Sequence, residues 1–175
     1  MKVVDREELK KMIDNNEDIS KVDTSQITNM CDLFNSSKIT KLPSNFNTIN
    51  VRNMGYMFYK SKITSLPANF NFINVTKIDN MFQDSNLSEE GYNKLLITLS
   101  KQRLNKGLEL DISDLRLKIT SKKSLLAKNR LIEKYNWEIS DDGENIQKKI
   151  YKEINEKSLN KKKENNIDVE TLNLF

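Results

Sequence analysis

Side chains that commonly perform catalysis or bind metals are scarce in this chain. Its 175 residues include no histidine and a single cysteine, Cys31, which removes the usual general base near neutral pH and excludes an internal disulfide or a cysteine-based metal cluster. The four glycines form no glycine-rich phosphate loop. The spacing of a calcium-binding loop is missing from the acidic residues Asp111, Asp114, Asp141 and Asp142. We therefore expect no enzymatic activity, catalytic residue, metal or cofactor, and interpret Cys31 as a small residue in a helix turn.

The residues that favour binding are three aromatic side chains at positions where the other copies of an internal repeat have polar residues. Polar positions of a repeat are expected to face solvent, so an aromatic side chain there either contacts a partner or fills a gap against a terminal helix or the tail. Three basic residues could supply a positive rim, although a solvated face is the more ordinary role of such residues. The candidate partner-binding residues are Tyr56, Tyr59, Phe72, Arg52, Lys38 and Lys62.

These residues belong to a segment that repeats itself at a spacing of 24 residues. The run Asn47–Phe58 aligns with Asn71–Phe82 without a gap, and a degraded copy at Val22–Phe34 keeps the same offsets. A spacing in this range is typical of a solenoid, in which each unit is too small to bury its own apolar face and must stack on its neighbours. Solenoids mostly bind other molecules, so the repeat favours a binding function.

Each unit is predicted to contain a short helix and a short strand. Four apolar residues of the second unit share one helical face, preceded by Asn50 as N-cap: Val51, Met54, Met57 and Phe58. The segments Lys38–Pro43 and Lys62–Pro67 have β-branched centres and end in proline, which favours short strands. Stacked units would then form a narrow parallel sheet on one side and a row of short helices on the other.

The repeats are predicted to lie between two caps. An amphipathic helix from Asp5 to about Asn15 would cover the first unit, with Asp5 as its N-cap. Beyond the repeats, a helix, a strand, a second helix and a closing strand are indicated: Ser88 to about Arg103, Leu108–Asp111, a helix capped by Ser121, and Tyr135–Ile139. We expect Trp137 to be the apolar anchor of this C-terminal cap.

A charged tail follows the cap. Ile146, Ile150 and Ile154 recur every four residues and predict one more helix, whereas Lys161–Lys163 is expected to be solvated. The predicted division of the chain is an N-terminal capping helix at 1–18, 24-residue repeats at 19–86, a C-terminal α/β cap at 87–143 and a polar helical or flexible tail at 144–175.

The repeats and the cap also resemble a known family. The runs Asn50-Val-Arg-Asn-Met-Gly-Tyr-Met-Phe58 and Lys62-Ile-Thr-Ser-Leu-Pro-Ala-Asn-Phe70 are similar to the BspA-like leucine-rich repeats, with their recurring Asn-Val-Thr-Asn-Met-x-x-Met-Phe element. The segment Ala127–Gly143 resembles the cap that follows those repeats. The resemblance implies an α/β fold of the leucine-rich-repeat type, here a short solenoid of about three units. It also implies an adhesive or protein-binding role, common in bacterial cell-surface proteins, and supplies no catalytic residue.

Charge and hydropathy bear on location. The net charge of +4 and the pI of about 9.0 come from lysines scattered along the chain rather than from a phosphate-binding surface. The N-terminus lacks the apolar core of a signal peptide, and no run of about 18 apolar residues could span a bilayer. We expect a cytoplasmic protein, or a surface protein if a leader was removed, with no small-molecule substrate.

The leading hypothesis is therefore a non-catalytic protein–protein interaction module that acts by occupancy. An inhibitor of a bacterial defence nuclease or a toxin-immunity protein, bacterial or from a mobile element, would be an example. One alternative is a surface adhesion protein that binds a host. Another is a weak nucleic-acid binder that uses its lysines, although the cluster Lys161–Lys163 lacks the interleaved aromatic residues that stack on bases.

Overall fold

The computed structural model describes residues 1–141. This part of the chain contains three α-helices and two small parallel sheets, which confirms the mixed α/β class. Three predictions for the tail lie outside the described residues: the helix at Ile146–Ile154, the Lys161–Lys163 cluster and the division at residue 144. We refer to residues 23–46, 47–70 and 71–86 as the first, second and third copies of the repeat.

The predicted N-terminal helix is confirmed as α1, Arg6–Asp14. Asp5 is its N-cap, because its carboxylate accepts a 2.8 Å hydrogen bond from the Glu8 amide. Leu9 and Ile13 are buried on the inner face of the helix. Strand β1, Lys2–Val3, precedes α1 in the sequence. After α1, the 3₁₀ turn η1, Ile19–Lys21, leads into strand β2, Val22–Asp23, which pairs in parallel with β1.

The predicted row of short helices is wrong, since the described copies contain turns and no helix. The amides of Asp32, Phe34 and Ser36 point away from their own copy and donate to carbonyls of the second copy at 2.8–3.0 Å. The amides between them donate locally, three residues back. An α-helix needs every interior amide for its own i→i−4 bonds, so this alternation is incompatible with one. The alternation also requires positive φ angles, as at Asp32 and Ser36 (58° and 57°).

The predicted strands at Lys38–Pro43 and Lys62–Pro67 are also absent. The Lys62 and Thr64 amides do reach the preceding copy, but Pro67 has no amide with which to continue the pairing. The parallel bridges between copies instead join Asn29 to Asn53 and Asn53 to Lys77. The inter-copy ladder, our name for the hydrogen bonds between successive copies, therefore runs through the segments that were predicted to be helical.

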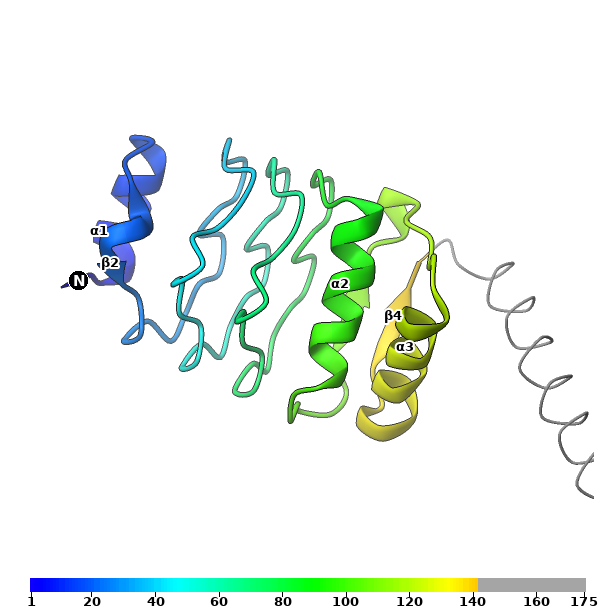
Figure 1. Cartoon of the computed structure of the whole chain (residues 1–175). Helices are drawn as coiled ribbons and strands as arrows, with labels where there is room; N and C mark the ends of the chain where they lie inside the picture. The colour runs from blue at the N-terminus through cyan, green and yellow to red at the C-terminus, as the bar shows by residue number, and fades with distance from the viewer. Residues whose placement is uncertain (142–175) are drawn as a thin grey trace, which may run out of the picture. The chain divides into compact units, whose positions relative to one another are not determined.

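The apolar residues of the repeat form a continuous core, as their pattern predicts. Phe34, Phe58 and Phe82 are fully buried and stack in one column, with ring centroids 5.5 Å apart and planes inclined by 15° in both pairs. Val51, Met54 and the other residues of the predicted apolar face are buried as well. Figure 1 shows the copies lying side by side between α1 and the next helix. A period of 24 residues thus identifies the core even though the local conformation was predicted wrongly.

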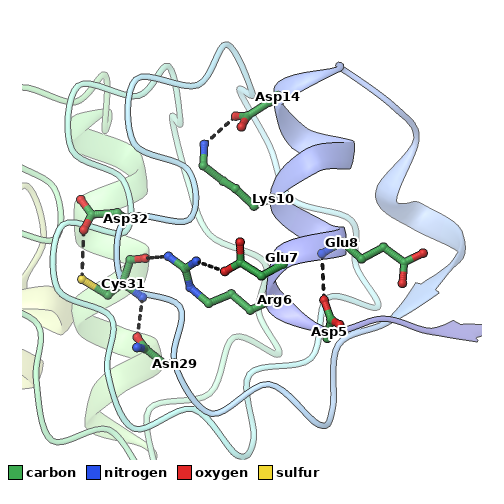
Figure 2. Close-up of polar contacts among 9 residues, drawn as sticks. All are labelled: Asp5, Arg6, Glu7, Glu8, Lys10, Asp14, Asn29, Cys31 and Asp32. Atoms are coloured by element: carbon green, nitrogen blue, oxygen red, sulfur yellow. Dashed lines mark hydrogen bonds and ion pairs between the residues drawn. The ribbon is translucent and has the colours of Figure 1, made fainter.

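The first copy is closed by a side chain that substitutes for a missing neighbour. In the second and third copies, the Gly55 and Asp79 carbonyls accept amide hydrogens from the preceding copy. The equivalent carbonyl of the first copy, that of Cys31, accepts a 2.6 Å hydrogen bond from the Arg6 guanidinium of α1 (Figure 2). Arg6 also pairs with the Glu7 carboxylate at 2.9 Å.

The third copy is closed by the predicted C-terminal cap, whose order of elements is confirmed. Its helices are α2 and α3, its strands β3 and β4 pair in parallel, and the 3₁₀ turn η2 follows β3. Their bounds are Glu89–Ser100, Lys122–Tyr135, Glu109–Asp111, Glu138–Ser140 and Ser113–Leu115. Ser88 and Ser121 are the N-caps of the two helices, whereas Ser88 had been predicted as the start of its helix and only Ser121 as a cap. Tyr135 ends α3 rather than starting the closing strand.

Polar side chains of the cap complete the ladder at the end of the second copy and in the third copy. The Gln102 amide donates to the Phe70 carbonyl at 2.9 Å and accepts from the Phe72 amide at 2.8 Å. Asn105 donates to the Val75 carbonyl at 2.8 Å. The carbonyl of Asn105 in turn accepts from the indole of Trp137, whose side chain is buried, so Trp137 is the predicted anchor.

Candidate functional site

Two of the predicted binding residues, Tyr56 and Tyr59, form a tyrosine pair on the surface of the second copy. Their rings meet edge to face, with centroids 5.7 Å apart and planes inclined by 75°, which is a favourable arrangement for aromatic quadrupoles. Tyr56 is 39% exposed, whereas Tyr59 is half-buried. The pair is therefore a packed aromatic surface that remains accessible to a partner.

The tyrosine pair is held in place by its neighbours. The Asn80 side chain of the third copy donates a 2.8 Å hydrogen bond to the Tyr56 hydroxyl. On the other side, the Lys60 ammonium lies 4.9 Å from the centroid of the Tyr59 ring, within cation–π range. These contacts restrict both rings before any partner binds, which lowers the entropy that binding would cost.

The backbone of the ladder explains why polar residues of the neighbouring copies surround the tyrosine pair. Tyr56, Asp32 and Asn80 occupy equivalent turn positions with a left-handed backbone conformation, and all three have φ between 52° and 58°. The Tyr56 amide bonds to the Asp79 carbonyl of the third copy, and the Tyr59 carbonyl accepts from Ser36 of the first, both at 2.8 Å. Equivalent positions are thus aligned across the copies, and the tyrosines replace aspartate, asparagine and glutamine in their two rows.

The prediction that Phe72 is an exposed binding residue is wrong, because its side chain is only 2% exposed. The equivalent residues Thr24 and Thr48 are polar but buried, since each hydroxyl bonds to the backbone of the next copy. No further copy follows Phe72, whose amide bonds to Gln102 of the cap instead. Its ring then packs against Phe70, with centroids 5.3 Å apart. Phe72 is part of the core against the cap.

The three predicted rim residues, Arg52, Lys38 and Lys62, are exposed, but no hydrogen bond or ring contact within residues 1–141 joins them to the tyrosines. Lys38 instead lines a cavity of about 190 Å³ beside Ile13 and Ile19. The basic residue that does contact the pair is Lys60, which the sequence reasoning missed. Its position directly after Tyr59, where the other copies have Ser36 and Asp84, is the signal that could have identified it.

Cys31 lies in a turn rather than in the helix that was predicted, and its environment opposes nucleophilic chemistry. Burial, followed by the hydrogen bond to Asp32, raises the pKa of the thiol above its ordinary value. The Sγ atom is 3.2 Å from the Asp32 carboxylate (Figure 2). A thiol held protonated in this way is a poor nucleophile near neutral pH.

Two searches of the described residues concern membranes and metals. None of the helices within residues 1–141 combines the length and the apolar character needed to cross a membrane. In the same residues, no group of three or more cysteine, aspartate and glutamate side chains is arranged to hold a metal ion.

Comparison with known proteins places the chain in a family. The described residues define the class of the protein. It is an α/β protein with three aligned copies of a repeat and an exposed tyrosine pair. Residues 6–97 match the family described as Mycoplasma protein of unknown function, DUF285. This range spans 92 of the 175 residues, and the chain belongs to that family. No curated protein and no solved structure matches the chain.

Proposed function

We propose that the protein is a non-catalytic module that binds another protein, built on a short solenoid of the leucine-rich-repeat type. The inter-copy ladder and the stacked phenylalanine column support the solenoid, because each copy obtains its hydrogen bonds and its apolar contacts mainly from its neighbours. The resemblance to the BspA-like repeats belongs to the same proposal. The observation that carries the binding function is the tyrosine pair.

The tyrosine pair has the properties of an interface anchor. Tyrosine is enriched among the few residues that contribute most of the free energy of binding, because a large ring with two side-chain torsions buries much area at small entropic cost. Here Asn80 and Lys60 already restrict the rings. The surrounding polar residues could form the hydrated rim that such anchors need. We propose that the protein acts by occupancy, covering a surface of its partner with this face.

A binding experiment tests the proposal. The full chain is immobilised and incubated with lysate of the source organism, in parallel with the variant Tyr56→Ala/Tyr59→Ala. A matched control carries Leu126→Ala/Ile132→Ala, which shortens two exposed side chains of α3 on another element. We expect a specific protein to be retained by the wild type and the control and lost from the tyrosine variant.

The dissociation constant of the purified partner makes the test quantitative. Loss of two anchor residues is expected to weaken binding by roughly 30-fold or more, corresponding to about 2 kcal/mol. Circular dichroism checks that each variant is folded. Unchanged affinity in a folded tyrosine variant would show that this face is not the interface, and retention of nucleic acid alone by the wild type would favour the nucleic-acid alternative.

A further inference from the structure

The inter-copy ladder has an unfilled position at its N-terminal end. Between the first and second copies, the Arg52 amide donates to the Thr28 carbonyl at 2.8 Å, and the Met30 amide donates to the Asn53 carbonyl at 2.9 Å. The Arg52 amide and the Asn53 carbonyl thus point towards the preceding copy. By the same geometry, the equivalent Thr28 amide and Asn29 carbonyl point towards the N-terminal end, where the described chain has β1 and α1 in place of another copy.

The N-terminal strand does not extend far enough to cover these groups. β1 pairs Lys2 with Val22 and Val3 with Asp23, and the Val4 amide adds one bond to Asp23 before the chain enters α1. Within residues 1–141, neither the Thr28 amide nor the Asn29 carbonyl has a hydrogen-bond partner. Both residues are exposed. The described chain therefore ends its ladder with one free donor and one free acceptor side by side.

A cavity of about 420 Å³ lies in front of this free edge. Its walls include Val3, Val4 and Ile27, which provide apolar surface, and Arg6 at the start of α1. The guanidinium of Arg6 binds Cys31 and Glu7 through its terminal nitrogens, but its Nε–H is buried without an acceptor. Figure 2 shows the Arg6 side chain extending from α1 to the backbone carbonyl of Cys31. A main-chain carbonyl entering the cavity would meet the free Thr28 amide there, whereas the Arg6 Nε–H is buried behind the cavity wall.

We propose that an extended segment of another protein binds at this edge as a parallel strand and continues the ladder. One carbonyl of the segment accepts the Thr28 amide hydrogen, and the amide two residues later donates to the Asn29 carbonyl, which repeats the pairing of Thr28 and Met30 with the second copy. Addition of a strand to a free edge obtains its affinity from such main-chain bonds and its selectivity from the side-chain pockets. The cavity walls combine the apolar Val3, Val4 and Ile27 with the charged Asp5, Arg6 and Glu8, so they favour a segment that carries a small aliphatic side chain beside polar ones.

Within the described residues, β1 and a second molecule of the protein are less compatible with this edge. The chain's own strand β1 is already paired with β2. Another molecule of the protein cannot stack on this one head to tail, because Gln102, Asn105 and Asp114 already bond to the C-terminal end of the ladder. Two identical edges related by a twofold axis would pair antiparallel, which is not the parallel geometry of this ladder.

A peptide made from the chain itself provides a probe. Residues Thr24–Asp32, with blocked ends and serine in place of Cys31, contain the segment that pairs in parallel with the second copy. The ¹⁵N-labelled full chain is titrated with this peptide and observed by NMR. We expect saturable shifts of the Thr28 and Asn29 amide signals, with the Tyr56 and Tyr59 signals unchanged.

The matched control is the same peptide with an N-methyl group on the Met30 nitrogen, which removes the donor to Asn29 without any change to the protein. Loss of one main-chain bond is expected to weaken binding roughly fivefold. Thr28→Pro in the full chain, which removes the free amide, should weaken the binding seen at Asn29 to at least the same extent, and Tyr56→Ala/Tyr59→Ala should leave it intact. Failure of the proposed tyrosine interface is therefore distinguishable from failure of this one. No saturable shift at millimolar peptide, equal binding of the N-methyl peptide, or a dimer in light scattering would overturn the proposal.

Discussion

At the scale of single residues, buried threonines join the copies. The Thr48 hydroxyl donates to the Asn71 carbonyl at 3.0 Å and accepts from the Asn71 amide at 2.8 Å, so one side chain satisfies both backbone groups. Thr24 makes the same two bonds to Asn47. Because Thr24 and Thr48 are buried, water cannot replace these bonds.

We predict that Thr48→Val destabilises the fold. Valine has nearly the same shape but no hydroxyl, so the Asn71 amide and carbonyl would be left unpaired, and the free energy of unfolding should fall by about 1–3 kcal/mol. Urea denaturation measures the change. Thr40→Val is the matched control, because Thr40 is exposed and a surface substitution of this kind should stay within about 0.5 kcal/mol. Equal midpoints for both variants would show that the Thr48 bonds do not stabilise the protein.

Residue-level prediction from the sequence succeeded where a side chain differed from its equivalents at an exposed position, and failed where the neighbouring element differed. Tyr56 replaces Asp32 and Asn80, which are only partly buried, so its exposure could be predicted. Phe72 also replaces two polar residues, but those threonines are buried between copies, and the neighbour of Phe72 is the cap. The alignment of the copies contains no information about which copy is last in space.

At the scale of elements, a buried polar cluster joins α2, α3 and the end of β4. The Tyr92 hydroxyl donates to the Asp141 carboxylate, and the Lys128 ammonium binds the same carboxylate at 2.9 Å. The Lys128 and Asp141 side chains are 6% and 2% exposed. Burial, then the charge of Asp141 and the hydrogen bond to it, raise the pKa of Tyr92 far above its ordinary value of 10.0.

The raised pKa of Tyr92 predicts a loss of stability in alkali. Tyrosine in the unfolded chain ionises near pH 10, whereas folded Tyr92 must stay protonated, so its contribution is complete below about pH 10 and declines as the pH rises further. Tyr92→Phe should cost about 1–3 kcal/mol near neutral pH because it removes a hydrogen bond to a charged group. Above about pH 10 the gap between the two proteins should narrow by up to about 1.4 kcal/mol per pH unit.

Urea denaturation of both proteins at about pH 8 and about pH 11 measures this gap. Taking the difference between the proteins cancels the titration of lysines and other tyrosines, which both chains share. A gap that stays constant across this range would mean that Tyr92 ionises as readily in the folded protein as in the unfolded chain.

The three helices, which begin at side-chain N-caps, could be predicted from the sequence, whereas the local structure of the repeat could not. Asp5, Ser88 and Ser121 are local N-cap signals, and the three helices begin where they indicate. In the repeat, the offsets of Val51 and Met54 fit a helical face, but the backbone there bonds to other copies. A pattern of buried side chains does not reveal where the amides donate, because that depends on contacts distant in sequence.

At the scale of the whole molecule, the two ends differ from the middle. Arg6 is specific to the first copy, and Gln102 meets the third, whereas the second copy has copies on both sides. We predict that a protein in which residues 47–70 are duplicated, with the duplicate inserted after residue 70, folds with the ladder intact and lengthened. Because the slope of the denaturant dependence scales with the surface exposed on unfolding, it should rise by roughly one seventh, the share of the chain that is added.

The control for this insertion is the same segment without Met54, which is fully buried and adjacent to the bridged residue Asn53. Its absence moves the following residues out of register by one position, so the control should lose stability. Circular dichroism and urea denaturation compare the two proteins. If both insertions were tolerated equally, the 24-residue register would not be what aligns the copies.

The positive φ angles in the copies affect how the protein unfolds. Six residues at equivalent turn positions have φ between 52° and 58° and none is glycine: Asp32, Ser36, Tyr56, Lys60, Asn80 and Asp84. Each costs about 1 kcal/mol relative to ordinary backbone, and such residues keep this conformation only where their surroundings enforce it. When a copy separates from its neighbours, nothing holds its turn residues at positive φ any longer, and their backbone returns to ordinary φ angles. The copies are therefore expected to melt in a single cooperative transition rather than fraying one after another from an end.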